Sequence, residues 1–408
     1  MRALYVSHNG MLENLGQSQV LPYLRGLAAR GIAIDLLSFE LPEADAGEID
    51  ALRSSLQGHG ITWTPLQRRR DPRLRVKIAE SARGVVGAFH QALSRRPDIV
   101  HGRSYFPTAI CDVLATLVPR AKLLFDCRGM IGDEYVDAGY WTTSRLEYRL
   151  VKRYESRVFR RAEGVVVLTD ALKRWIEDQG WFGARTHVAA IPCCVDMDRF
   201  RFDVDARTQT RRELRLDDRL VLVYAGSLGS WYREPDLARF AGIVKRRASR
   251  KIAFLVLTPS PPEPLVGLLE AAGLTPDEIV VRRVRPSDMS RHLSAGDIGL
   301  SFIMSCFSKK GSSPTKVAEY LACGLTVVLN GDIGDQAELA AEGDACVVID
   351  GFSDARLETA ADRALALAQR PLPERVAASR RVAEDRFGLE KVGVARYEEL
   401  YRALGRDR

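Results

Sequence analysis

The amino-acid sequence predicts an α/β protein with two doubly wound domains, each built around a parallel sheet. Its 408 residues exceed what one hydrophobic core normally covers, which indicates two domains of ordinary size. Short runs of β-branched residues alternate with helix-period segments along the chain, as is typical of parallel βαβ units. A polar stretch at residues 195–217 interrupts this alternation. We therefore predict Rossmann-like domains at residues 1–200 and 201–387.

The strands expected in the first domain are short apolar runs, at Ala3–Ser7, Ile32–Phe39, Ile61–Leu66, Asp98–His101, Leu123–Phe125, Val165–Leu168 and Val188–Ile191. Helical patterns lie between most of them, including Gln17–Arg30 and Thr143–Ala162. The second domain repeats the rhythm, with strands at Leu220–Tyr224, Ile252–Leu257, Ile279–Val284, Ile298–Ile303, Thr326–Leu329 and Cys346–Ile349. Two such domains would face each other across a cleft, and ligands of these sheets lie beyond the carboxyl ends of the strands.

The composition is that of a globular protein, with 46% hydrophobic and 28% charged residues. The N-terminus lacks the apolar core of a signal peptide, and no stretch approaches the roughly 18 apolar residues of a membrane span, so we expect a cytoplasmic protein. Seven cysteines without a C-x-x-C pair argue against structural zinc or a disulfide framework. A net charge of +7 indicates an anionic partner, namely nucleic acid, anionic lipid or a phosphorylated metabolite.

The stretch "GSSPTKVAEYLACG" at residues 311–324 predicts a helix with a cation at the wrong end. Ser313 is the expected N-cap, Pro314 the first helical residue and Gly324 the stop. Lys316 then falls in the first turn, where the helix dipole disfavours a cation by about 0.3–1 kcal/mol. Glu319 lies three residues further along the same face, so an i,i+3 ion pair is one explanation for the lysine.

Glycines and arginines follow several predicted strands. Gly16 precedes a helix, and Gly226 and Gly229 allow the backbone to approach a ligand closely. Arg233 offers a bidentate phosphate partner, and Arg103 and Arg128 stand at the rim of the first sheet. Each arginine alone would be explained by an exposed salt bridge. Together with Lys316 they favour a dianion or a larger phosphate.

Other chemistry finds less support in the sequence. No Asp-x-Asp pair stands at a strand end to hold a divalent ion, so no metal site is predicted. There is no G-x-S-x-G elbow, and "GSLGSWYREPD" lacks the Lys-Ser/Thr of a P-loop. His8 and His101 stand at strand ends, where a structural or solvated role competes with a place in the cleft.

Seven motifs then identify a resemblance that spans nearly the whole chain: "LGQSQVLPYLRGLA", "FDCRGMIGDEY", "VVVLTDALKRW", "IPCCVDMDRF", "YAGSLGSWY", "LSAGDIGLSFI" and "SSPTKVAEYLACGLTVV". The chain resembles retaining, nucleotide-sugar-dependent glycosyltransferases of family 4, which have the GT-B fold, in a subgroup with an S-P-T-K-x-x-E-Y-L-A motif. The resemblance implies that the second domain binds the sugar nucleotide and that the first holds the acceptor and carries Gly16 toward the diphosphate. It also implies that the last helix, at about residues 388–408, crosses back onto the first domain.

The resemblance places specific residues in the donor site. Glu319 matches the second glutamate of a Glu-x7-Glu motif, usually a ligand of the ribose hydroxyls. The predicted donor contacts are Gly16, Ser227, Val284, Ser312, Ser313, Pro314, Thr315 and Glu319. Arg103, Arg233 and Lys316 are predicted to act in catalysis, and His101 and Arg128 to contact the acceptor or the sugar. No cofactor is predicted.

The sequence also departs from the family pattern. The first glutamate of that motif falls on Gly311, and the usual phosphate-binding Arg and Lys fall on Ser227 and Arg233. Two positions often held by histidine fall on Arg103 and Arg128. We expect Lys316 to replace the missing cation, its ammonium and the amides of residues 312–315 receiving the diphosphate.

The predicted function is therefore metal-independent hexosyl or related transfer from a nucleoside-diphosphate sugar to a glycan, lipid-linked or small-molecule acceptor. The alternatives are a nucleotide-sugar epimerase of the same fold and a non-catalytic binder of anions or membrane. The basic run Arg68–Lys77 suggests an anionic membrane surface as a partner on the inner face, with a solvated basic face as the other explanation. Nucleic acid is not an expected partner.

Overall fold

The computed structural model describes residues 1–68, 74–229 and 231–406, and only the backbone of residues 74–81. The chain forms two compact units. The first unit comprises Met1–Pro192 together with Leu389–Arg408, and the second comprises Cys193–Gly388. The polar stretch at residues 195–217 thus lies inside the second unit and contains helix α9 (Val204–Glu213).

The first unit is built on a parallel sheet with strand order β3-β2-β1-β4-β5-β6-β7. In chain order the strands are β1 (Arg2–Ser7), β2 (Ala33–Glu40), β3 (Ile61–Gln67), β4 (Ile99–Arg103), β5 (Lys122–Asp126), β6 (Gly164–Val167) and β7 (His187–Ala190). The helices are α1 (Asn14–Gln19), α2 (Leu21–Ala29), α3 (Ala46–Gly58), α4 (Leu74–Arg95), α5 (Tyr105–Leu117), α6 (Ile131–Asp137), α7 (Leu146–Arg161) and α8 (Asp170–Asp178). The order reverses between β1 and β4, the place where such sheets bind ligands.

The second unit repeats the architecture with the order β10-β9-β8-β11-β12-β13, again all parallel. Its strands are β8 (Leu220–Ala225), β9 (Ile252–Leu257), β10 (Ile279–Arg282), β11 (Ile298–Ser301), β12 (Thr326–Asn330) and β13 (Cys346–Ile349). Besides α9, its helices are α10 (Glu234–Arg247), α11 (Glu263–Ala271), α12 (Met289–Ser294), α13 (Thr315–Ala322), α14 (Asp354–Ala368) and α15 (Leu372–Phe387). Short 3-10 turns join them at η1 (Pro276–Glu278), η2 (Pro286–Asp288), η3 (Phe307–Gly311) and η4 (Gln336–Ala341).

The predicted fold class is confirmed, and each predicted strand coincides with an observed one. The central strands are buried along their whole length, because helices cover both faces of a parallel sheet. Some local predictions were wrong. The helix expected at Gln17–Arg30 is two helices separated by Val20, β4 continues to Arg103, and α13 has Pro314 rather than Ser313 at its N-cap. That the units face each other across a cleft stays a prediction.

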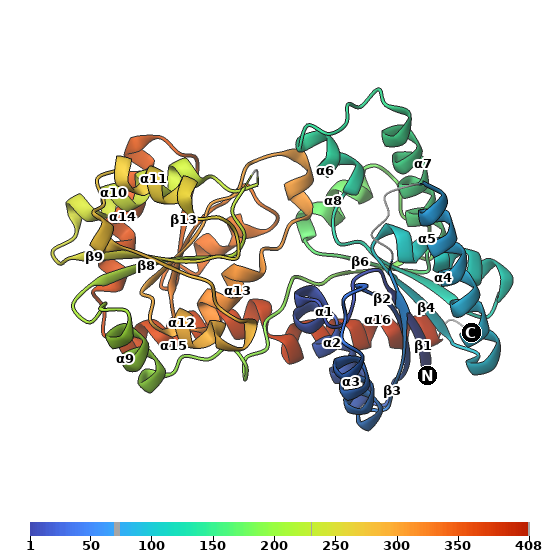
Figure 1. The fold of residues 1–408 in the computed structure, drawn as a ribbon. Helices are drawn as coiled ribbons and strands as arrows, with labels where there is room; N and C mark the ends of the chain where they lie inside the picture. The colour runs from blue at the N-terminus through green and yellow to red at the C-terminus, as the bar shows by residue number, and fades with distance from the viewer. Residues whose placement is uncertain (69–73, 230, 407–408) are drawn as a thin grey trace. The chain divides into compact units, whose positions relative to one another are not determined.

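The C-terminal segment returns to the first unit, as predicted. It forms the π-helical turn η5 (Leu389–Val394) and helix α16 (Ala395–Arg406), drawn in red beside the blue strands of the first unit in Figure 1. The apolar side chains of this segment are buried, at Val392, Val394, Tyr397, Leu400 and Leu404. Gly26 of α2 allows this approach, since a Cβ there would come 2.5 Å from a methyl group of Val394.

Candidate functional site

Lys316 lies in the first turn of α13, where the sequence predicted an unfavourable cation. Its side chain is buried, and its ammonium nitrogen stands 4.1 Å from the ring centre of Tyr224 and 4.0 Å from that of Tyr232. Within the part of the chain that the structure describes, this nitrogen has no hydrogen-bond partner. The i,i+3 ion pair with Glu319 is therefore not formed. The two aromatic rings stabilise the charge, but a buried ammonium without an acceptor is costly.

The turn after β8 covers Lys316. Gly226 directly follows β8 and has a φ of +124°, a value that favours glycine. A Cβ at this position would lie 3.2 Å from the Lys316 ammonium. The absence of a side chain thus lets the backbone pass close to the ammonium. Ser227 comes next, and its carbonyl oxygen accepts a hydrogen bond from the hydroxyl of Tyr224.

Burial perturbs both ionisable groups on α13. It lowers the pKa of Lys316 to about 7, although the carboxylate of Glu319 partly offsets the effect. It raises the pKa of the half-buried Glu319 to about 7, against the opposing charges of Arg199 and Lys316. Both groups therefore titrate near neutral pH. Such pKa shifts are frequent at functional sites. An anion bound beside Lys316 would raise the pKa of its ammonium again and so restore its positive charge.

The loop before α13 has a different hydrogen-bond pattern from the one expected. The hydroxyl of Ser313 accepts from the backbone N–H of Cys193 at 3.0 Å instead of capping the helix. The amide of Ser312 donates to the carbonyl of Lys309, and Pro314 has no N–H. Of the predicted loop amides, those of Ser313 and Thr315 remain for a ligand. No side chain caps α13, and its first turn holds no acidic residue, both of which favour an anion there.

Arg233 is the N-cap residue of α10 and is anchored at two points. Its Nε donates to the carboxylate of Asp236 at 2.6 Å, and its guanidinium stacks on Phe352 with 4.1 Å to the ring centre. Its side chain is 35% exposed. It follows Tyr232 in the chain, so it belongs to the same loop that covers Lys316. Val284, by contrast, follows the edge strand β10, two strands away from β8.

Sequence reasoning missed the aromatic surroundings of the lysines. Tyr224 and Tyr232 enclose Lys316, and the ammonium of Lys309 stands 3.6 Å from the ring centre of Trp231. The available signal was the spacing of aromatic residues in "YAGSLGSWY", at the carboxyl end of the central strand of the unit.

Three of the predicted residues of the first unit, His101, Arg103 and Arg128, gather around a buried carboxylate that the sequence did not point to. Asp126, the last residue of β5, lies 3.3 Å from Arg103, 3.4 Å from Arg128 and 3.6 Å from Nε2 of His101. Burial alone would raise the pKa of Asp126, but Arg128, His101 and Arg103 lower it below its usual range. The two arginines thus pair with a fully buried carboxylate, and the exposed salt bridges considered as their alternative are not formed.

His101 lies inside this cluster and is only 1% exposed. Its Nδ1 is 2.7 Å from the hydroxyl of Tyr401 on α16, and its ring centre is 4.2 Å from that of Tyr5. Burial lowers the pKa of His101, although Asp126 counteracts it. His8 stacks edge-on against Phe106, with ring centres 5.1 Å apart.

Gly16 lies inside α1 rather than before a helix. A Cβ there would stand 2.2 Å from the carbonyl oxygen of Gly10, so only glycine lets α1 pack on the loop that follows β1. Glu40 holds the same loop by accepting from the backbone N–H of Met11 at 2.8 Å. The close packing of Gly16 within its own unit explains the glycine without a ligand, and its role at the diphosphate stays a prediction.

Residues 69–73 of the basic run lie outside the described residues, as do the side chains of residues 74–77. Arg68 is described, and it pairs with Glu13 at 3.2 Å. In the described ranges no group of three or more His, Cys, Asp or Glu side chains could hold a metal ion. None of the helices described is long and apolar enough to cross a membrane.

Solved structures similar to this chain over nearly its whole length include a glycosyltransferase and a sugar-phosphate synthase. A glycosyltransferase from Rickettsia africae has a TM-score of 0.71 and 14% identity, over 100% of this chain and 99% of that one. Sucrose-phosphate synthase from Thermosynechococcus elongatus has a TM-score of 0.70 and 16% identity, over 100% of both chains. HepE from Anabaena, whose structure was determined in complex with UDP and glucose, has a TM-score of 0.70 and 14% identity, over 98% of this chain and 100% of that one.

Among curated protein sequences, none matches the chain significantly. The match to a sequence family covers most of the first unit but less than half of the chain. Residues 16–194 match the glycosyl transferase 4-like domain, and the chain as a whole has the GT-B fold of glycosyltransferases.

Proposed function

We propose that this protein is a retaining glycosyltransferase that moves a sugar from a nucleoside-diphosphate sugar to a hydroxyl of a glycan, lipid-linked or small-molecule acceptor. The observation that carries the proposal is Lys316, a buried ammonium without a hydrogen-bond partner among the described residues, at the uncapped start of α13. A diphosphate would supply the missing negative charge. HepE, which has the same fold, was determined with UDP and with UDP-glucose, which supports a sugar nucleotide as the donor.

The donor would be held along one helix. In the proposal the diphosphate contacts Lys316 and the amides of Ser313 and Thr315, with Arg233 reaching it from the loop after β8. Glu319, one turn further along α13, accepts two hydrogen bonds from the vicinal hydroxyls of the ribose. Lys316 and Arg233 meet the charge of the diphosphate, so no metal ion is required, and EDTA should leave turnover unchanged.

The proposed reaction is a front-face displacement. The acceptor oxygen bonds to the anomeric carbon as the bond from that carbon to the phosphate oxygen breaks, and the acceptor proton passes to the departing phosphate. Charge develops on the leaving diphosphate, and a cation fixed in a water-poor site stabilises it most strongly in the transition state. Lys316 is our first candidate for this role, because its tyrosine walls already exclude water.

A thermal-shift panel tests the proposal. UDP, GDP, ADP and CDP, each alone and as sugar nucleotides, are added to the protein, and the ligand bound only by the folded state raises Tm. We expect Lys316→Ala to weaken the effective nucleotide by about 10- to 100-fold, as for a lost charge-assisted hydrogen bond. The proposal fails if Lys316→Ala leaves this affinity unchanged while Arg233→Ala abolishes it.

Product analysis separates the transferase from its alternatives. Incubated with the donor and no acceptor, an epimerase would release an altered sugar, whereas the proposed enzyme would release only slow hydrolysis products. A non-catalytic binder would turn over nothing, and its binding would depend steeply on salt without preferring nucleoside diphosphates.

We also propose that the acceptor is presented at a membrane and that the basic run Arg68–Lys77 meets anionic lipid on the cytoplasmic side. Each basic residue near such a surface contributes about 1 kcal/mol. Sedimentation with liposomes should then increase with the fraction of anionic lipid. Equal sedimentation with neutral and anionic liposomes would contradict the proposal.

A further inference from the structure

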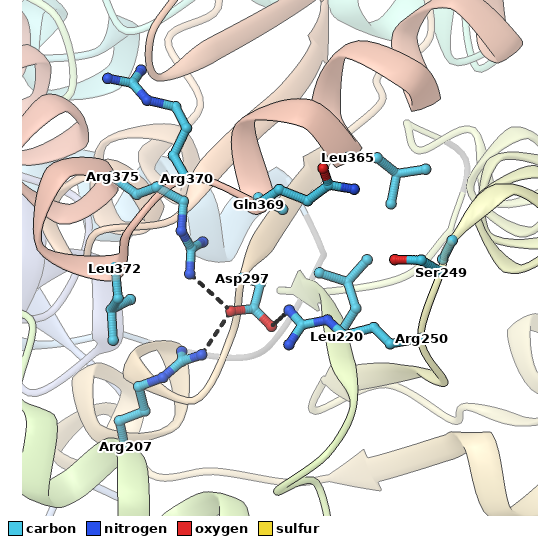
Figure 2. Close-up of a pocket in the computed structure, with 12 residues that line it drawn as sticks. Arg207, Leu220, Ser249, Arg250, Asp297, Leu365, Gln369, Arg370, Leu372 and Arg375 are labelled. Carbon is cyan, nitrogen blue, oxygen red and sulfur yellow. Dashed lines mark hydrogen bonds and ion pairs between the residues drawn. The ribbon is translucent and has the colours of Figure 1, made fainter.

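The second unit contains a buried carboxylate surrounded by an excess of arginines. Asp297 is fully buried directly before β11, and its oxygens lie 2.6 Å from Arg207, 3.3 Å from Arg211, 3.3 Å from Arg375 and 3.7 Å from Arg250. Figure 2 shows three of these guanidinium groups converging on it from different directions. In the described part of the chain, none of the four arginines pairs with another carboxylate. Four cations thus share one anion.

Two of these arginines have their hydrogen bonds satisfied. Arg207 also donates to the backbone carbonyls of Ser294 at 2.9 Å and Gly296 at 2.6 Å. Arg211 donates to the carbonyl of Ala295 at 2.8 Å. These two arginines therefore explain how Asp297 and the end of α12 are held together. Arg375 donates one hydrogen bond from Nη2 to Asp297 at 3.3 Å, and no hydrogen bond is seen for the guanidinium of Arg250 in the described chain.

Arg375 and Arg250 keep donors for a ligand. Arg375 is only 5% exposed, yet its Nε has no hydrogen-bond partner among the residues described. Its pKa is lowered by burial, and Asp297 restores it only in part because Arg207 and Arg250 add like charge. The side chain of Arg250 is 46% exposed and reaches Asp297 only at 3.7 Å, beyond hydrogen-bond distance.

Arg375 and Arg250 both line a pocket of about 420 Å³. Its polar groups include Ser249 and Gln369, and its apolar walls include Leu220, Leu365 and Leu372. Leu372 is also the first residue of α15, a helix of 16 residues that no side chain caps. The pocket lies at the amino ends of β8 and β11, whereas Lys316 lies at the carboxyl end of β8. The length of that strand separates the two places by about 20 Å.

We propose that this pocket binds a small molecule that carries a phosphate monoester, separately from the donor site. The phosphate would lie between the guanidinium of Arg250 and Nε of Arg375, and its remaining oxygens would face the N-terminus of α15. The remainder of the ligand would contact the leucine walls and hydrogen-bond to Gln369 and Ser249. The pocket has the size usual for such ligands. The site would offset the three positive charges that Asp297 leaves uncompensated.

Calorimetric titration with inorganic phosphate and with glycerol 3-phosphate tests the site, with glycerol as the uncharged control. Arg250→Ala is the main variant, because this half-exposed side chain can be removed without opening the core. Arg246→Ala is the matched control, since Arg246 is an exposed arginine near the end of α10 that does not line the pocket. Lys316→Ala reports on binding in the donor site instead.

We expect Arg250→Ala to raise Kd for both anions by about 10- to 100-fold, and Arg246→Ala and Lys316→Ala to leave it unchanged. Arg375→Met should weaken binding similarly, with the Tm of each variant measured to verify folding. The inference is overturned by any of three results: no binding to the native protein, equal binding to Arg250→Ala, or a loss that Lys316→Ala or Arg246→Ala reproduces. Nucleoside diphosphate binding to the Arg250→Ala protein is expected to be intact, so failure here is distinct from failure of the donor site.

Discussion

Replacing Lys316 by methionine should make the protein more stable while weakening its hold on nucleotide. Methionine fills about the same space between Tyr224 and Tyr232 but carries no charge. The native lysine is buried without a hydrogen-bond acceptor in the described chain, so its charge is a cost to folding. A residue that lowers stability and is nonetheless present is best explained by a function that needs the charge.

The size of the effect follows from the pKa of Lys316, which burial lowers from 10.5 to about 7. At pH 7 the unfolded chain holds the proton and the folded protein holds it about half of the time, a difference worth about 4 kcal/mol. The cation–π contacts with the two rings stabilise the native lysine by about 1 kcal/mol each. Lys316→Met is therefore expected to raise the free energy of unfolding by about 2–4 kcal/mol. For a unit of this size that gain raises Tm by about 4 °C or more.

The gain should also depend on pH with a defined sign. Because the folded state depresses the pKa of a base, the cost is full below pH 7 and vanishes as pH rises through 10.5. Glu319 also titrates near neutral pH, so the comparison is best made above pH 8, where this carboxyl is ionised.

Scanning calorimetry of both proteins at several pH values measures the difference. Lys251→Met is the control, since Lys251 is exposed in the same unit and its replacement should change stability by less than about 0.5 kcal/mol. The reasoning is refuted if Lys316→Met is no more stable than the native protein just above pH 8, or if its advantage does not shrink as the pH rises further. Unchanged nucleotide affinity in this variant would refute the functional part alone.

Three further changes have expected outcomes. Glu319→Gln should reduce the affinity for the effective nucleoside diphosphate about tenfold but leave the affinity for its 2′,3′-dideoxy analogue unchanged. Titration calorimetry can compare the two affinities. An equal loss for both ligands would exclude the ribose contact. Gly16→Ala should cost about 1–3 kcal/mol in urea unfolding because its Cβ has no room, whereas Gly267→Ala, with nothing within 4 Å, should be neutral or stabilising. Tyr397→Phe removes the 3.1 Å hydrogen bond to Asp126 and should cost about 1–3 kcal/mol, seen as a lower Tm of the first unit; an unchanged Tm would show that this bond contributes nothing.

The strands were predictable because each is an apolar run bounded by polar residues. Ile252–Leu257 and Cys346–Ile349 were predicted to the residue, since both are buried and end in loops. Helix ends were less predictable, because single side chains decide them. Serine is a favoured N-cap residue, but the hydroxyl of Ser313 accepts a hydrogen bond from the backbone N–H of Cys193 instead. Local residue spacing does not predict a partner so distant in the chain.

The candidate site was predictable in position but not in its contacts. Parallel strand order brings the start of α13 beside the end of β8, so Lys316 and Gly226 were both found from their places in the pattern. That two tyrosines enclose the lysine depends on side-chain packing across the sheet. Asp126 was missed for a similar reason, since one acidic residue in a strand carries no periodic signal.

The return of residues 389–406 to the first unit makes that unit a candidate for circular permutation. A Cβ on Gly405 would lie 3.2 Å from the side chain of Met1, so the two ends of this part of the chain are adjacent. A short linker between them would yield a polypeptide that starts at Leu389 and ends at Pro192, with the whole first unit, α16 included, in a single stretch of sequence. Expressed by itself, this rearranged protein would show whether the unit that matches the glycosyl transferase 4-like domain folds and binds an acceptor without the other one.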